Sequence, residues 1–389
     1  MIYLDNAAST RIHDDVFDSM LPFLKEQYGN PSSIHRQGRI TRKAINKARK
    51  QIASLINADP AEILITSGGT ESNNTALNGI TSQFSSGQII TSSIEHDAVL
   101  EPCKKLSSKG FKVDYLPVDK FGMIRISDLD DILSEKTSLV SIMFGNNEVG
   151  TIQPIEKIAK ICHEKQVIFH TDAVQAIGKI SVDVKKLDVD LLSISSHKLH
   201  GPKGIGALYI KDGIKIDPMI LGGGQEFRLR SGTENVASIV GFGQACEITQ
   251  NHLSENISWI KKLQSQLVQK ILTEITEVTF NGHLESRLNN NAHFTFLGVN
   301  GEDLIIKLDE YGIAASTGSA CSVNTQKASH VLESMGFSLE QITGSLRLTV
   351  GIFNTENEIN ETVKILKKVV EELRAVSPFK EKYSFKSKS

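Results

Sequence analysis

Short apolar runs alternate with longer amphipathic segments along most of the chain. Each run is rich in the residues that favour strands, and the stretch at 155–162 places its apolar residues at helical spacing. Strands that alternate with helices are typical of an α/β fold with a mainly parallel sheet. The runs predict seven strands, at 63–66, 88–92, 113–117, 138–144, 167–171, 191–195 and 205–210.

The pattern changes after about residue 251. A long amphipathic helix is predicted at 254–276, and shorter strands and a final helix at 356–375 follow it. We therefore expect a large domain over residues 13–256. A smaller α+β domain takes residues 257–389, and residues 1–12 are expected to join it.

Composition and charge narrow the classes of protein that the chain can belong to. Its 389 residues are 40% hydrophobic and carry 43 basic against 45 acidic side chains, a net charge of -2. This balance supplies no overall attraction to nucleic acid or to an anionic membrane, so we expect neither as a partner. No signal peptide and no apolar run of the roughly 20 residues that span a bilayer is present, which favours a cytoplasmic protein. The Lys-rich end, 380–389, is expected to be a solvated tail.

The chain has four cysteines. They form no Cys-x-x-Cys pair, so we expect reduced thiols, no disulfide framework and no metal site. Cys162 and Cys246 lie on or beside apolar helical faces and are expected in the core, and packing is also favoured for Cys103. Cys321 stands instead among small polar residues, where a thiol can be accessible and can ionise.

Polar clusters follow several of the predicted strands, and ligands of parallel sheets bind at the carboxyl ends of strands. The first cluster, Thr66-Ser67-Gly68-Gly69-Thr70-Glu71, can bring backbone N–H groups and a helix N-terminus to an anion. A tight turn explains this cluster equally well when it is taken alone.

Four further clusters have the same ambiguity. Lys198 directly follows run 191–195 and is either a surface lysine or an amine activated toward an aldehyde. Asp172 ends run 167–171 and either caps a helix or pairs with a pyridinium nitrogen. His96 and Asn147 either shape turns or contact a cofactor. Together the clusters supply what pyridoxal 5′-phosphate (PLP) requires: an anion cradle, a reactive amine, a carboxylate, a stacking ring and an amide.

At these residues the sequence resembles the class V aminotransferase-like family of PLP enzymes, and within it the cysteine desulfurases of the NifS/IscS type. The resemblance covers nearly the whole chain and implies the PLP-dependent transferase fold of type I. It implies a large PLP-binding domain, with a mainly parallel seven-stranded sheet, and a small domain that carries a catalytic cysteine loop. The matching motifs begin with Tyr3-Leu4-Asp5-Asn6-Ala7-Ala8 and Gly29-Asn30-Pro31-Ser32-Ser33, continue through the clusters above and Arg230-Ser231-Gly232-Thr233, and end at Ser319-Ala320-Cys321.

The resemblance implies a role for each matching residue. Lys198 holds PLP covalently, Asp172 pairs with its ring nitrogen, and His96 stacks on its ring. Gln175 and Asn147 contact its phenolic oxygen, and Arg347 binds the carboxylate of the substrate, for which Asn147 is also a contact. The phosphate ligands are Gly69, Thr70, Ser195, His197 and, from the second subunit of a homodimer, Thr233.

The resemblance also implies the reaction. L-cysteine displaces Lys198, which then moves the α-proton, and the Cys321 thiolate takes the sulfur as a persulfide while L-alanine leaves. The persulfide is passed to an acceptor protein for iron–sulfur cluster assembly or tRNA thiolation.

The chain departs from the family pattern at two places. Ile352 stands where an arginine is common, at the mouth of the substrate site. Ala328 stands where a proline is common, at the far end of the cysteine loop. Three alternatives are left to be weighed by experiment: a selenocysteine lyase or other PLP β-lyase, an ordinary aminotransferase, and a non-catalytic scaffold that keeps the fold.

Overall fold

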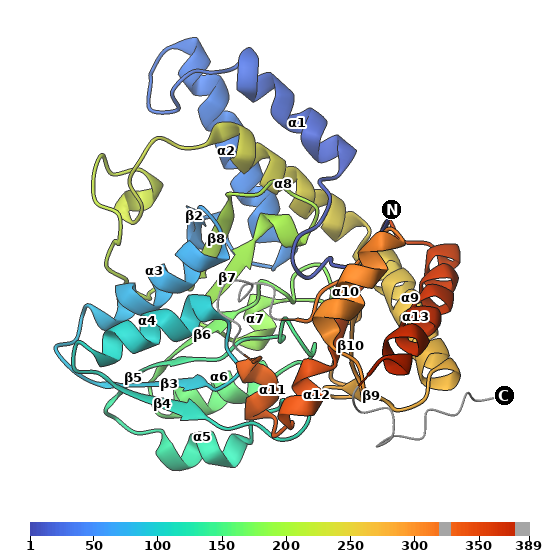
Figure 1. Cartoon of the computed structure of the whole chain (residues 1–389). Helices are drawn as coiled ribbons and strands as arrows, with labels where there is room; N and C mark the ends of the chain where they lie inside the picture. The colour runs from blue at the N-terminus through green and yellow to red at the C-terminus, as the bar shows by residue number, and fades with distance from the viewer. Residues whose placement is uncertain (319–327, 378–389) are drawn as a thin grey trace.

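A computed structural model describes residues 1–318 and 328–377 of the chain. Its centre is a seven-stranded sheet in the order β2-β8-β7-β6-β5-β3-β4 (Figure 1). Only β8 runs antiparallel to its neighbours within this sheet, so the expected mainly parallel sheet is confirmed. The strands are β2 (Ile63–Thr66), β3 (Gln88–Ser92), β4 (Lys112–Leu116), β5 (Thr137–Ser141), β6 (Ile168–Asp172), β7 (Leu191–Ser195) and β8 (Gly206–Ile210).

Each strand of this sheet sends alternate side chains to opposite faces, as the two-residue period of a strand requires. On one face Leu64, Leu139 and Leu208 pack in one apolar cluster against α3 and α4. On the other face Ile63 and Val140 belong to a larger cluster that includes residues of α2, α6 and α8. Both faces are therefore covered, which explains the nearly continuous apolar runs in the sequence. The helices are α1 (Asp14–Lys25), α2 (Arg36–Leu55), α3 (Gly69–Thr81), α4 (Asp97–Ser107), α5 (Ile126–Ile132), α6 (Ile155–Glu164), α7 (Val184–Leu187) and α8 (Val236–Asn251).

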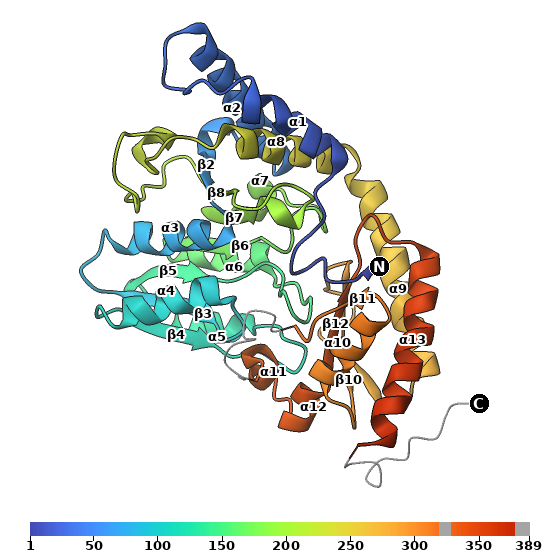
Figure 2. The ribbon, with the colours of Figure 1, turned by 45° about the horizontal axis from the view of Figure 1, so that its top comes forward.

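A second layer of strands and helices follows α8. Its antiparallel sheet has the order β12-β10-β9 and buries Phe294 and Phe296 against the long helices α9 and α13. Figure 2 shows this part standing beside the large sheet. Its elements are α9 (Leu253–Glu274), β9 (Val278–Asn281), β10 (Asn291–Phe296), α10 (Gly301–Glu310), β11 (Ile313–Ala314), α11 (His330–Ser334), α12 (Leu339–Thr343), β12 (Ser345–Thr349) and α13 (Glu356–Ala375).

The N-terminal segment connects the two parts. Strand β1 (Ile2–Tyr3) pairs in parallel with β11, and the Asn6 side chain donates to the carbonyl of Thr349 at 2.8 Å. A few residues later Thr10 donates to the carbonyl of His197, next to the large sheet. We propose the division into residues 13–256 and residues 1–12 with 257–389, which the separate apolar clusters and the pairing of β1 with β11 support.

None of the helices in residues 1–318 and 328–377 combines the length and apolar character that crossing a membrane requires.

Candidate active site at the strand ends

The turn from β2 into α3 is shaped by glycines. Gly68 has φ 151°, and α3 begins at Gly69 with no side-chain cap on its first N–H groups. A Cβ on Gly206 of β8 would lie 2.7 Å from the Cα of Gly68 and 2.5 Å from the carbonyl oxygen of Ile194. Glycine at position 206 therefore lets β8 approach the turn more closely than a residue with a side chain would permit. The uncapped end of α3 is left open to an anion.

Four of the predicted phosphate ligands line one open cleft in front of this helix end. The cleft has a volume of about 430 Å³ and is lined by Gly69, Thr70, Ser195 and His197. Burial, with help from Lys198 and Lys203, lowers the pKa of His197 to about 4, so its imidazole is neutral at pH 7. Its Nδ1 lies 3.2 Å from the hydroxyl of Ser9. The cleft thus offers neutral hydrogen-bonding groups beside the positive end of a helix.

Thr233 does not line that cleft. It is exposed and borders a different pocket, with Ser67 and Glu226. The segment that carries it is tied to α3 by Arg230, which forms an ion pair with Glu71 at 2.9 Å. Within one chain the structure therefore does not bring Thr233 together with the other predicted phosphate ligands.

Lys198 ends a short 3₁₀ turn, Ser196–Lys198, directly after β7. Its Nζ donates to the carbonyls of Ala7 and Ala8, at 2.6 and 2.8 Å. The side-chain amide of Gln175 donates to the same Ala7 carbonyl at 3.0 Å. The predicted lysine and glutamine thus converge on one point of the N-terminal segment, a contact that sequence reasoning did not foresee.

Asp172 lies at the end of β6, buried and 6% exposed. Its Oδ2 accepts from the Asn73 side chain at 2.6 Å, and its Oδ1 accepts from the Val174 N–H at 2.9 Å. Both bonds orient this carboxyl group, which suits it to pair with a pyridinium nitrogen. Asn73 was missed as a functional residue; its place four residues into α3, beside the glycine turn, is the signal that could have found it.

His96 is the N-cap of α4, where its Nδ1 accepts from the Ala98 N–H at 3.0 Å. This bond fixes the orientation of the ring. The residue before it, Glu95, is fully buried. Its Oε1 accepts from Ser92 and from the Met143 N–H, and burial raises its pKa to about 8.

Arg347 is 2% exposed and binds three parts of the chain. Its Nη2 donates to Asp5 at 2.8 Å, and its Nη1 donates to the carbonyls of Asn147, at 2.8 Å, and Gly318. Its Nε has no acceptor among the described residues. A buried donor without a partner is unfavourable, so Arg347 has hydrogen-bonding capacity for a carboxylate.

Cys321 lies outside the described residues, but both flanks of its segment lie near Glu148. Ser329 donates to Glu148 Oε2 at 2.5 Å, and a Cβ on Gly318 would lie 3.2 Å from the same oxygen. The other three thiols are buried, as expected. Burial raises the pKa of Cys103 and of Cys162 to about 12 and that of Cys246 well above its ordinary value, so none of these three is a ready nucleophile.

The fold and the site define a PLP-dependent enzyme. The open cleft lined by Gly69, Thr70, Ser195 and His197 suits a phosphate, buried Asp172 suits a pyridinium nitrogen, and Lys198 stands at the end of the neighbouring strand. When bound, PLP withdraws electrons from the α-carbon of an amino acid.

Comparison with known proteins gives the family. The sequence profile of the family described as "Aminotransferase class-V" matches residues 2–361, and the chain belongs to this family. It is 47% identical to "Cysteine desulfurase IscS" of Dictyoglomus turgidum over 100% of this chain and 99% of that protein. It is 48% identical to "Cysteine desulfurase IscS" of Methanosarcina thermophila, over 97% of this chain and 94% of that protein.

Solved structures agree with the family. A structure named "NIFS-LIKE PROTEIN" has a TM-score of 0.89 and 42% identity, over 96% of this chain and 100% of that chain. A NifS-like protein from Rickettsia africae has a TM-score of 0.86 and 33% identity, over 95% of this chain and 99% of that chain. The expected fold and the resemblance to this family are thus confirmed.

Proposed function

We propose that the chain is a PLP-dependent cysteine desulfurase. It converts L-cysteine to L-alanine and transfers the sulfur to the thiol of Cys321 as a persulfide. Acceptor proteins for iron–sulfur cluster assembly or tRNA thiolation then receive this sulfur. The observation that carries the proposal is the meeting of Lys198, Asp172 and the open end of α3 at one edge of the sheet, in a chain similar over its full length to cysteine desulfurases.

The residues of the chain divide the work of binding. Gly69, Thr70, Ser195 and His197 hold the phosphate, Asp172 holds the ring nitrogen, and His96 stacks on the ring, with Asn73 orienting the Asp172 carboxylate. Gln175 and Asn147 contact the phenolic oxygen. Because Gln175 and Lys198 already share the Ala7 carbonyl as acceptor, the N-terminal segment forms one wall of the site.

Lys198 carries the proton transfer. When PLP is bound, the amine of Lys198 would hold it, and in its free form this amine would accept the α-proton of the substrate. In the structure the two carbonyls of Ala7 and Ala8 orient its Nζ. The same contacts keep the released amine close to the α-carbon instead of letting it turn to solvent.

Arg347 binds the carboxylate of L-cysteine. Its Nε has no acceptor within residues 1–318 and 328–377, and its Nη2 is held by Asp5. A substrate carboxylate that binds in a bidentate manner therefore competes with Asp5 for Arg347. This competition makes Asp5 a determinant of substrate affinity.

Sulfur transfer balances without an added oxidant. The Cys321 thiolate attacks the sulfur of L-cysteine, so that the S–S bond forms as the carbon–sulfur bond breaks and leaves its electron pair on the amino-acid fragment. The β-carbon then takes up a proton, the α-carbon recovers one from Lys198, and L-alanine leaves. Cys321 must be a free thiol at the start of each cycle. This requirement favours a reducing compartment, and we propose the cytoplasm. Glu148, through Ser329, anchors the chain on the C-terminal side of Cys321.

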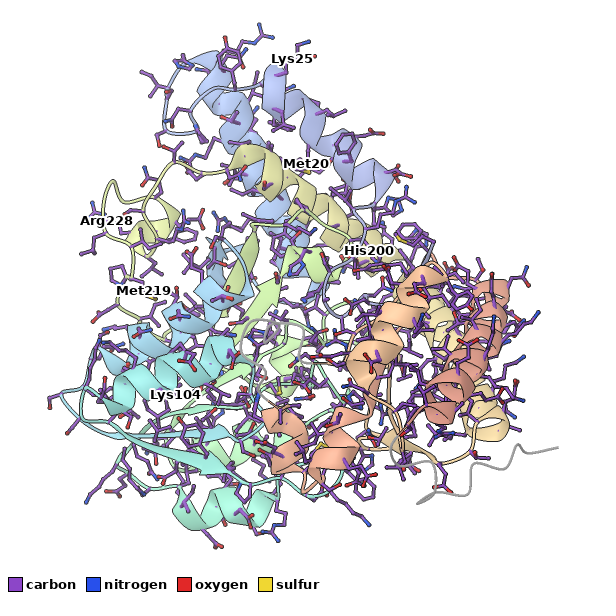
Figure 3. All side chains as sticks on the ribbon, in the orientation of Figure 1. Met20, Lys25, Lys104, His200, Met219 and Arg228 are labelled. Atoms are coloured by element: carbon purple, nitrogen blue, oxygen red, sulfur yellow. The ribbon has the colours of Figure 1, made fainter. Side chains whose placement is uncertain are left out.

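A homodimer completes the phosphate site in this proposal. Thr233 is exposed and does not line the cleft of its own chain, which supports a role in the partner subunit. The neighbouring loop projects from the body of the molecule, with Met219 and Arg228 on it (Figure 3). Its Leu221 is 80% exposed and its Phe227 56% exposed, the kind of apolar surface that an interface covers.

The decisive experiment measures L-alanine release from L-cysteine by the purified protein together with the absorbance of bound PLP. We expect the variant Cys321→Ser to keep the absorbance and lose turnover, because the cofactor site is intact and the sulfur acceptor is absent. Cys103→Ala is the matched control and should retain turnover, because that thiol is buried. Undiminished turnover by Cys321→Ser would contradict the role of Cys321, and turnover that requires a keto acid would indicate an aminotransferase.

A further inference from the structure

A buried lysine that the mechanism above does not use lies directly behind Lys198. Lys179 is 5% exposed, and its Nζ donates to the backbone carbonyl of Lys198 at 2.6 Å. Its own backbone carbonyl accepts from the side chain of Asn289 at 2.9 Å. A lysine is almost never fully buried without a charged partner, so this position requires an explanation.

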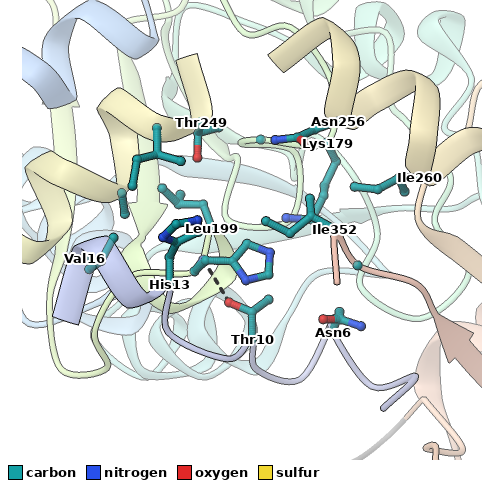
Figure 4. Close-up of a pocket in the computed structure, with 15 residues that line it drawn as sticks. Asn6, Thr10, His13, Val16, Lys179, Leu199, Thr249, Asn256, Ile260 and Ile352 are labelled. Atoms are coloured by element: carbon teal, nitrogen blue, oxygen red, sulfur yellow. Dashed lines mark hydrogen bonds between the residues drawn. The ribbon is translucent and has the colours of Figure 1, made fainter. Parts of the chain in front are cut away.

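The surroundings of Lys179 contain no compensating negative charge. It lines a small cavity of about 20 Å³, between α8, α9 and the N-terminal segment, and the described residues around that cavity include no carboxylate. Figure 4 shows Lys179 there with Asn256, Ile352, Thr10 and Asn6. The titratable groups that face it are Lys198, His200 and His13.

The charge state of these neighbours follows from their burial. Burial and Lys179 lower the pKa of His200 to about 4, so His200 is neutral at pH 7, and its Nδ1 bonds to the carbonyl of Arg11. Burial and the nearby Lys198 lower the pKa of Lys179 to about 8. Lys179 is therefore mostly protonated at pH 7, and Lys198 is the charged neighbour that lowers its pKa.

We propose that Lys179 is a positioning residue for Lys198, whose main chain it holds through the carbonyl and whose amine it keeps in the neutral form by its positive charge. A like charge nearby disfavours protonation of an amine, and a neutral amine is what proton abstraction requires. The proposal rests on the proposed function, in which Lys198 attaches the cofactor and moves the α-proton.

The geometry explains why a lysine is placed there. The main chain around Lys198 is tied on both sides, because the carbonyl of His197 accepts from Thr10 and the carbonyl of Lys198 accepts from Lys179. A neutral donor would satisfy the second carbonyl equally well. Only a cation adds an electrostatic field that disfavours protonation of the Lys198 amine. Burying that cation costs free energy.

The test compares three variants of the PLP-loaded protein with the wild type. Lys179→Met removes the donor and the charge, Lys179→Gln keeps a donor without the charge, and Lys179→Arg keeps both. Lys185→Met, at an exposed lysine of α7, is the control. The primary readout is the midpoint of the pH-dependent change in the absorbance of bound PLP, which reports protonation at Lys198 and does not require turnover.

We expect this midpoint to move to higher pH by about one unit in Lys179→Met and in Lys179→Gln, and to stay near the wild-type value in Lys179→Arg and Lys185→Met. At pH 7 we expect kcat to fall about tenfold in the two neutral variants, with KM for L-cysteine changed less than about twofold. The difference in kcat should shrink above pH about 8, where Lys179 of the wild type loses its own proton.

An unchanged midpoint in Lys179→Gln would overturn the proposal, and so would an equal shift in Lys179→Arg, which would exclude the charge as the cause. If Lys179→Met does not fold, the Gln and Arg variants still decide, because both keep a hydrogen-bond donor. A wild-type protein that binds PLP but releases no L-alanine would contradict the proposed function and leave this comparison intact.

Discussion

At the scale of single residues, the site works through side chains whose burial sets their charge. His170 is an example, because burial lowers its pKa to about 3 and its two nitrogens lie within hydrogen-bonding distance of Ser141 and Ser193. It is thus a neutral bridge between β5, β6 and β7, two residues before Asp172. The carboxyl group of Asp172 is held by two donors, the Asn73 side chain and the Val174 N–H.

The hydrogen bond from Asn73 predicts a specific loss. In Asn73→Ala the Asp172 carboxylate loses its side-chain donor, so we expect PLP affinity and kcat each to fall about tenfold, with little change in KM for L-cysteine. Asn74→Ala is the matched control, since the Asn74 side chain bonds only to the carbonyl of Thr70 one turn back in α3. Fluorescence titration with PLP measures the affinity. Equal PLP affinities in the two variants would show that Asn73 does not contribute to cofactor binding.

Glu95 predicts how stability depends on pH. Its carboxyl is raised from an ordinary pKa of 4.5 to about 8, so between these values the folded protein holds a proton that the unfolded chain releases. Its contribution to stability is therefore complete below pH about 4.5 and is lost as the pH rises toward 8. Glu95→Gln keeps an oxygen for Ser92 and Met143, and its stability should decline less over this range.

The measurement is the urea midpoint of unfolding at pH 5, 6, 7 and 8. The exposed Glu101→Gln is the control and should follow the wild-type curve, because its side chain is 62% exposed. Parallel pH curves for Glu95→Gln and the wild type would show that Glu95 is ionised in the folded protein.

At the scale of elements, the order of apolar and polar residues was enough to predict the large sheet. The ranges expected for β2, β3 and β7 agree with the structure, because a strand covered on both faces is apolar throughout. The run 138–144 was predicted too long. Pairing in β5 ends at Ser141, although the N–H groups of Ile142 and Phe144 still donate to the carbonyls of His170 and Asp172.

The start of α3 shows a different limit of sequence reasoning. Glycine weakens a helix, yet α3 begins at Gly69. The glycines are required there by close packing, since a Cβ on Gly69 would lie 2.7 Å from Val174 Cγ2. Long-range contact of this kind overrides local propensity and leaves no signal in the sequence around it.

Gly206 gives a prediction at this scale. Gly206→Ala places a methyl group against the backbone of Gly68 and Ile194, so we expect a loss of about 1–3 kcal/mol in stability and at least tenfold weaker PLP binding. Leu208→Ala, on the same strand, should cost a similar or larger stability of about 2–5 kcal/mol without weakening PLP binding, because Leu208 lies in the core away from the cleft. Thermal unfolding and PLP titration of both variants separate the two effects, and tight PLP binding by Gly206→Ala would contradict the close approach as the basis of the cradle.

At the scale of the whole molecule, the sequence could not predict the individual contacts that distant segments make within the site. The role of Lys198 was inferred from a motif, yet the acceptors of its amine, Ala7 and Ala8, are about 190 residues away and are ordinary alanines. The same holds for Asp5, which meets Arg347 across the chain. Backbone carbonyls carry no residue-specific signal, so such contacts appear only in three dimensions.

The proposed dimer predicts complementation between two damaged chains. Lys198→Ala has no reactive amine, and Thr233→Ala weakens the phosphate site to which Thr233 belongs. If Thr233 serves the partner subunit, a mixed dimer of the two variants contains one complete site, so co-refolding should restore about half the wild-type activity in each mixed dimer. Activity no higher than the average of the two separate variants would place Thr233 in the site of its own subunit.

The N-terminal segment has a consequence for the order in which the enzyme matures on the ribosome. Residues 1–10 are made first, yet their partners β11 and β12 are made last, after nearly the whole chain has emerged. The large sheet can fold earlier, as N-terminal parts of nascent chains do. Until β12 arrives, however, the hydrogen bonds between Thr349 and the segment Asn6–Ala7, which help to fix Ala7 and Ala8 over Lys198, cannot form. The arrangement delays assembly of the reactive site to the end of translation, so that an interrupted chain would hold the fold of the large sheet without a working lysine.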